Sequence, residues 1–179
     1  PTGGPFTVPP PAWQGRFSIQ GNGTFVGENS ATLAINAGRQ SIVTGDLLVQ
    51  ANGTAAGPGS ATITVDGGGL VALGNINLLA TGAPNGTTGI GQGGSATLNV
   101  LNGGQMGAGL DLTVSADGFG GFDDGGEGGS GTGGTAAINV AGTGSLLIGD
   151  TISASADGLG GALALDAVTG NAIVADNGG

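Results

Sequence analysis

Alternating apolar and polar residues recur along this chain in a six-residue pattern. The pattern occurs at Ser30–Ile35, Ser60–Val65, Ser95–Val100 and Thr135–Val140, and the interval between successive copies increases along the chain. A two-residue period is typical of a β-strand that buries one of its faces. A repeated strand unit can bury that face only by stacking on its own copies. The pattern therefore predicts an all-β fold, a parallel β-helix or β-solenoid.

Each copy continues with a Gly-containing turn, a short apolar run, another alternating run and a Gly-rich loop. We therefore expect about three short strands per coil, repeats of 30–40 residues, and loops of variable length at one corner. In the third copy the strands are expected at Ala96–Leu101, Gln105–Ala108 and Asp111–Ala116. The third and fourth copies match at a single constant offset, which aligns Leu98 with Ile138, whereas the first two match with a one-residue slip near the middle turn.

The inward positions of this pattern predict one continuous core, formed by Leu98, Val100, Leu112, Val114, Ile138, Val140 and Ile152. Asn99 is expected to face outward. We divide the solenoid, residues 16–179, into units at 16–29 (partial), 30–59, 60–94, 95–134, 135–161 and 162–179 (partial).

The two ends of the chain are interpreted as incomplete copies. Phe17–Ile19 is aligned with Ile138–Val140, which predicts a first strand of a coil. Ala162–Leu165 and Ala172–Val174 are expected to start another coil. Residues 1–15 contain Pro9–Pro11 and are expected to be a linker or cap, with a docking peptide as the alternative. We expect the repeats to continue in further units or in end-to-end contact between copies.

Composition narrows the function classes. Gly contributes 44 of 179 residues and only 3% are aromatic, so the core must be thin and built from Val, Ile, Leu, Ala and Thr. The chain has twelve acidic residues, two arginines and no Lys or His, and its net charge is −10. This balance disfavours nucleic acid and anionic lipid as partners. No apolar run has the length of a membrane span, so we expect no direct membrane insertion by this segment.

The residue types also argue against catalysis. The chain lacks His, Cys, Lys and Tyr, so general bases and nucleophiles reduce to carboxylates and hydroxyls. We expect no catalytic residues, no cofactor and no enzyme activity. The alternative is a polysaccharide-degrading β-helix enzyme that uses paired carboxylates. Asp123, Asp124 and Glu127 are the candidate Ca²⁺ ligands, and the competing interpretation is a solvated acidic loop.

Two further sets of polar residues have alternative interpretations. Asn22, Asn52 and Asn85 each begin an Asn-Gly-Thr sequon, so they are glycosylation candidates, although Asn-Gly is also a common turn dipeptide. Outward rows of Thr and Asn could present polar groups to carbohydrate or form hydrogen-bonded ladders along the stack. These rows contain Thr32, Thr62, Thr97, Asn99 and Asn139.

The Ser-Ala-Thr-Leu-x-Val strands and loops such as Ala116–Gly121 and Ala156–Gly161 resemble the repeats of large bacterial surface proteins. These are autotransporter passengers and filamentous-haemagglutinin-like adhesins, and the resemblance covers residues 16–175. It implies a right-handed β-helix, secretion and display at the bacterial cell surface, associated with the outer membrane.

The function expected from this resemblance is a structural segment of an adhesin or extracellular fibre, acting in adhesion or in matrix and biofilm formation. Expected partners are neighbouring repeats or other copies, end to end, and a surface carbohydrate or host receptor. A self-assembling filament subunit is the alternative.

Overall fold

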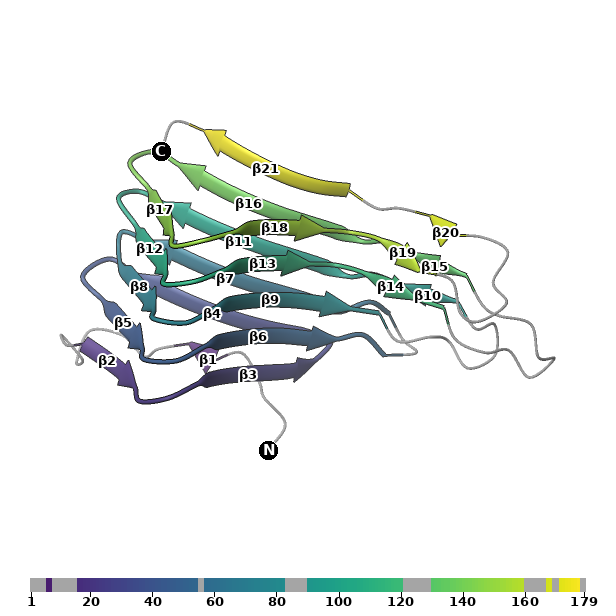
Figure 1. Ribbon diagram of the computed structural model, residues 1–179, viewed down its shortest axis with the longest axis horizontal. Helices are drawn as coiled ribbons and strands as arrows, with labels where there is room; N and C mark the ends of the chain where they lie inside the picture. Colours follow the sequence, from purple (N-terminus) through teal and green to yellow (C-terminus); the bar gives the residue numbers. More distant parts are fainter. Residues whose placement is uncertain are drawn as a thin grey trace.

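The structure is a computed structural model that describes residues 6–7, 16–54, 57–82, 90–120, 130–159, 167–168 and 171–177. These residues form strands, turns and loops that wind into stacked coils, so that equivalent strands of successive coils lie side by side (Figure 1). Every pairing between the named strands is parallel, as the registers show. The predicted parallel β-solenoid is confirmed.

Three sheets run along the stack, one for each strand of the repeat. The first contains β1 (Phe6–Thr7), β4 (Ser30–Asn36), β7 (Ser60–Asp66), β11 (Ser95–Leu101), β16 (Thr135–Ala141) and β21 (Asn171–Asn177). The second contains β2 (Arg16–Ile19), β5 (Gln40–Val43), β8 (Gly69–Ala72), β12 (Gln105–Ala108) and β17 (Ser145–Ile148). The third contains β3 (Gly23–Glu28), β6 (Leu47–Asn52), β9 (Ile76–Thr81), β13 (Leu112–Ser115) and β18 (Ile152–Ser155).

The stems of the Gly-rich loops form two smaller sheets that the sequence pattern did not predict. One contains β10 (Gly91–Gln92), β15 (Gly131–Thr132) and β20 (Ala167–Val168). The other contains β14 (Gly118–Phe119) and β19 (Gly158–Leu159), and the bridge from Gly82 to Gly118 extends it. Two-residue strands carry too little alternation to be recognised from sequence.

Glycine lets these two stem sheets pack closely. A Cβ at Gly82 would overlap the carbonyl oxygen of Gln92, and a Cβ at Gly118 would overlap that of Thr132. Because any side chain would collide with a backbone across the interface, the high glycine content has a packing role here as well as a role in turns.

The register of the stack follows the sequence offsets. Strands β11, β12 and β13 pair with β16, β17 and β18 at one constant offset, so that Leu98 lies beside Ile138 and Leu112 beside Ile152. Between the first two copies the offset changes from 30 in the first sheet to 29 in the second, as predicted. The cause is the turn after β7, which has two residues, 67–68, whereas the turns after β4 and β11 have three.

The alignment of the N-terminal copy was wrong by one strand. Residues 16–19 form β2, which pairs with β5 in the second sheet, and β3 pairs with β6 in the third. Short alternating runs look alike in the two sheets, but β2 and β5 have four residues, whereas β4 has seven. The first-sheet strand beside β4 is β1, within the segment expected to be a linker or cap.

At the other end, β21 pairs with β16 in the first sheet, so Ala172–Val174 begins another coil as predicted. Ala162–Leu165 lies outside the described residues, as does most of residues 1–15.

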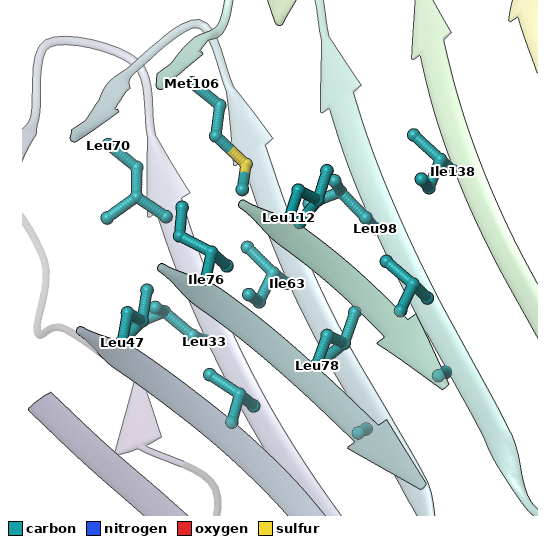
Figure 2. Close-up of a cluster of buried hydrophobic side chains, with 14 of the residues drawn as sticks. Leu33, Leu47, Ile63, Leu70, Ile76, Leu78, Leu98, Met106, Leu112 and Ile138 are labelled. Atoms are coloured by element: carbon teal, nitrogen blue, oxygen red, sulfur yellow. The ribbon is translucent and has the colours of Figure 1, made fainter. Parts of the chain in front are cut away.

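The core lies between the three sheets, and Figure 2 shows Leu33, Ile63 and Leu98 of the first sheet facing Leu47, Ile76 and Leu112 of the third. Of the seven predicted core residues, five are buried, namely Leu98, Val100, Leu112, Val114 and Ile138. Val140 is only half-buried against the core.

The predicted burial of Ile152 is wrong, because 47% of its surface is exposed. It pairs with buried Leu112, so its place in the register is inward, but β18 is the last described strand of its sheet. Burial in a solenoid requires a coil on each side, which the alternation within one strand cannot reveal.

Candidate functional site

The acidic residues singled out as Ca²⁺ candidates, Asp123, Asp124 and Glu127, lie outside the described residues, as does Asn85. Within the described ranges, no group of three or more Asp, Glu, His or Cys side chains is placed to hold a metal ion. The calcium and solvated-loop interpretations of the acidic loop therefore both stay predictions.

The other two sequon asparagines make hydrogen bonds within the stack. Asn22 precedes β3, and its Oδ1 accepts a hydrogen bond of 2.9 Å from the backbone N–H of Asp46 in the next coil. Asn52 lies in β6 and accepts from Gln50 Nε2 at 2.7 Å and from Thr81 Oγ1 at 3.4 Å. Both side chains have a structural role, and whether either is glycosylated stays a prediction.

Asn22 begins a ladder of side chains at the corner between the second and third sheets, which we call the corner ladder. Its members are Asn22, Asp46, Asn75 and Asp111. Each Oδ1 accepts the backbone N–H of the equivalent residue one coil further on: Asp46 accepts from Asn75 at 2.8 Å, Asn75 from Asp111 at 3.1 Å, and Asp111 from Thr151 at 3.0 Å. The ladder ends at Thr151, whose side chain has no carbonyl oxygen.

The corner ladder satisfies backbone donors that this corner would otherwise leave unpaired. Its sequence signal is an Asn or Asp directly before the first apolar residue of the third strand, as in Asp46-Leu47 and Asn75-Ile76. The sequence pattern did not predict the corner ladder, because the spacing between its members varies with the length of each coil.

Asp117, which recurs as Asp157, forms a second carboxylate contact between coils. Its oxygens accept from Ser115 Oγ at 2.7 Å, from Ser155 Oγ at 2.9 Å and from the backbone N–H of Asp157 at 2.8 Å. A carboxylate with three donors inside the stack stabilises the join between coils.

The outward face of the first sheet carries the predicted polar rows. Thr32, Thr62 and Thr97 occupy one register position in successive coils. In the next row, Asn139 Nδ2 donates to Asn99 Oδ1 at 2.9 Å, and Asn99 Nδ2 donates to Thr64 Oγ1 at 3.4 Å. Asn99 thus faces outward, and the predicted ladder is present in this row.

A groove of about 350 Å³ crosses the corner between the first and second sheets, and we call it the corner groove. It is lined by Gly38, Arg39, Gln40, Gly67, Gly68, Gly69, Gly103 and Gln105. Gln40, Gly69 and Gln105 occupy one register position in β5, β8 and β12. The missing side chain at Gly69 leaves a gap between the two glutamines, and the short Gly67–Gly68 turn and Arg39 also line the groove.

Arg39 supplies the charge of the corner groove. Its Nη1 atom is shielded from solvent and has no hydrogen-bond partner among the described residues. A guanidinium nitrogen in this state has lost its water without gaining an acceptor, which is costly for a charged group. Arg39, a lining residue of the groove, therefore has a guanidinium nitrogen that lacks a hydrogen-bond acceptor in the described part of the chain.

Comparisons with protein-family models, curated proteins and solved structures gave no match to this chain. In the described part of the chain, no helix has the length and apolarity needed to cross a membrane. The likeness to bacterial surface repeats therefore rests on the sequence motifs alone.

Proposed function

We propose that this chain is a structural β-solenoid segment of a secreted bacterial cell-surface adhesin or extracellular fibre. Its role is extension: each coil adds about one strand spacing, roughly 4.8 Å, to the length of the molecule. The observation that carries the proposal is the unbroken parallel register of the three main sheets, which persists through repeats of different length.

The use of the acidic residues also supports a structural role. Asp46, Asp111 and Asp117 accept hydrogen bonds from neighbouring coils, so these carboxylates are engaged in holding the stack together. A glycosidase requires two carboxylates that face each other across a cleft and remain available to the substrate. The polysaccharide-degrading enzyme is the weaker hypothesis for this reason.

Surface labelling of the cells that make the protein tests the proposal. An antibody raised against residues 16–179 should label intact cells as strongly as permeabilised cells. A periplasmic or cytoplasmic control protein must stay unlabelled until the cells are permeabilised. A signal for this chain that requires permeabilisation would contradict surface display.

Removal of one coil tests extension separately. Deleting residues 95–134 joins Gly94 to Thr135, which occupies the register position of Ser95 in the next coil. The variant should fold and be shorter by about one strand spacing in small-angle X-ray scattering. Global unfolding of this variant would contradict a modular spacer.

A filament that stacks end to end is the second candidate. It is favoured by apolar exposure at the last described strand of the third sheet, where Ile152 occupies an inward register position and is nevertheless 47% exposed. A second copy stacked on this strand would cover Ile152 and supply a strand partner. Light scattering should then show concentration-dependent growth that Ile152→Asp abolishes, whereas a monomer at all concentrations would exclude this candidate.

A further inference from the structure

We propose that the corner groove binds a small hydroxylated carboxylate, of which a sugar acid such as a uronate is the chemical class that fits. The inference does not depend on the proposed surface function, because it rests on the local chemistry of three adjacent coils.

The charge of the groove selects the carboxylate. Arg39 is the only charged residue among the eight that line it. The guanidinium is planar with five donors, and it pairs with a carboxylate through two parallel hydrogen bonds. Nη1 has no acceptor among the described residues and is shielded from solvent. A carboxylate in the groove would supply the missing counter-charge, and it would also supply the missing acceptor if the side chain turned Nη1 toward the groove.

The acidic residue that lies next to a lining residue in the sequence does not take the place of that ligand. Asp66 immediately precedes the groove turn Gly67–Gly68, but its Oδ1 accepts a hydrogen bond of 2.9 Å from Asn102 Nδ2. Asp66 is not among the residues that line the groove. Its carboxylate therefore binds Asn102 and contributes no atom to the lining of the groove.

The remaining lining selects hydroxyl groups. Gln40 and Gln105 stand on either side of the gap at Gly69, and each amide can both donate and accept hydrogen bonds. A hydroxyl group has the same dual capacity. The volume of about 350 Å³ lies at the small end of ligand sites, which suits one sugar ring better than a peptide or a lipid.

Glycines build the groove, so a substitution can fill it without changing its charge. A Cβ at Gly69 would have Gln40 Cγ at 3.5 Å as its nearest neighbour, which is an ordinary contact. Gly69→Val should therefore be accepted in β8 while its methyl groups occupy the gap. Gly107→Val is the matched control, since Gly107 also faces outward in the second sheet, has its nearest neighbour at 3.6 Å and lies outside the groove.

Isothermal titration of the chain with D-galacturonate tests the proposal, with neutral D-galactose as the ligand control. We expect saturable binding of galacturonate and none of galactose. Arg39→Gln should weaken binding by at least about tenfold, which corresponds to the loss of one charge-assisted hydrogen bond. Gly69→Val should also weaken binding, because its methyl groups occupy the space of the ligand. Gly107→Val should bind as the unchanged chain does, and circular dichroism must show that each variant is folded.

Four results would overturn the proposal: no saturable binding of galacturonate, equal binding of galactose, unchanged affinity in folded Arg39→Gln, or unchanged affinity in folded Gly69→Val. Because two independent variants address charge and space, a folding failure in one leaves the other decisive.

Discussion

Leu112 and Ile152 occupy equivalent inward positions in adjacent strands of the third sheet, and they should differ sharply in their contribution to stability. Leu112 is 1% exposed, with Ile76 in the strand below and Ile152 in the strand above. Ile152 is 47% exposed at the last described strand. The pair therefore offers a test of how stacking, separately from alternation, buries a side chain.

The magnitudes follow from these exposures. Leu112→Ala removes three carbon groups, worth about 0.8 kcal/mol each in transfer, and leaves a cavity between two coils, so we expect a loss of about 3–4 kcal/mol. Ile152→Ala removes a side chain that is half in water and leaves no enclosed cavity, so we expect about 1 kcal/mol. Relative to a domain stability of about 5–15 kcal/mol, the first change is large.

Urea unfolding followed by far-ultraviolet circular dichroism measures both losses, and the two variants should keep the slope of the unchanged chain. Amide hydrogen exchange should show lost protection across β13 and its neighbours in Leu112→Ala, and only at β18 in Ile152→Ala. Equal losses in the two variants, or a larger loss in Ile152→Ala, would refute the burial assigned by the stack.

Three further predictions concern the corner ladder, the stem sheets and the acidic loop. Asn75→Ala leaves the N–H of Asp111 without its acceptor and should lower the free energy of unfolding in urea by about 1–3 kcal/mol. A change within experimental error would contradict a stabilising role for the corner ladder. Gly118→Ala would overlap the Thr132 carbonyl and should lower stability by about 1–3 kcal/mol, whereas Gly107→Ala, with space for a Cβ, should be neutral or slightly stabilising. Millimolar Ca²⁺ should not raise the melting temperature, and a rise that Asp123→Asn removes would instead establish a calcium site.

Sequence alone predicted the parts of the fold that depend on alternation and repetition. Leu98 and Val100 alternate with polar neighbours, as do their counterparts in the other copies, so their burial and the parallel stacking could be predicted from the strand pattern. The constant offset between the third and fourth copies predicted the register of their strands. Length differences among turns, as at Gly67–Gly68, were visible only as a one-residue slip.

The errors have a common physical cause. Ile152 has the same local pattern as Leu112, but its exposure depends on what lies on the next coil. Phe17–Ile19 alternates as a first-sheet strand would, but its partner is β5. The corner groove arises where Gly69 lies between Gln40 and Gln105 at one register position. These three residues come from three coils, and only the one-residue shift in the register between the first two copies aligns them. Sequence patterns within one strand carry none of this information.

Disulfide trapping tests the central claim, parallel in-register stacking of the coils, most directly. The chain contains no cysteine, so an engineered pair of cysteines can form a disulfide only with each other within one chain. Thr62 pairs with Thr97, whereas Asn99 pairs with Thr64, one outward position further along. Paired residues on adjacent strands lie about 4.8 Å apart, within disulfide range, while a shift of two residues increases the separation to roughly 8 Å. We expect Thr62→Cys/Thr97→Cys to oxidise readily in the folded chain and Thr62→Cys/Asn99→Cys to remain reduced, and the opposite result would contradict the stacked register.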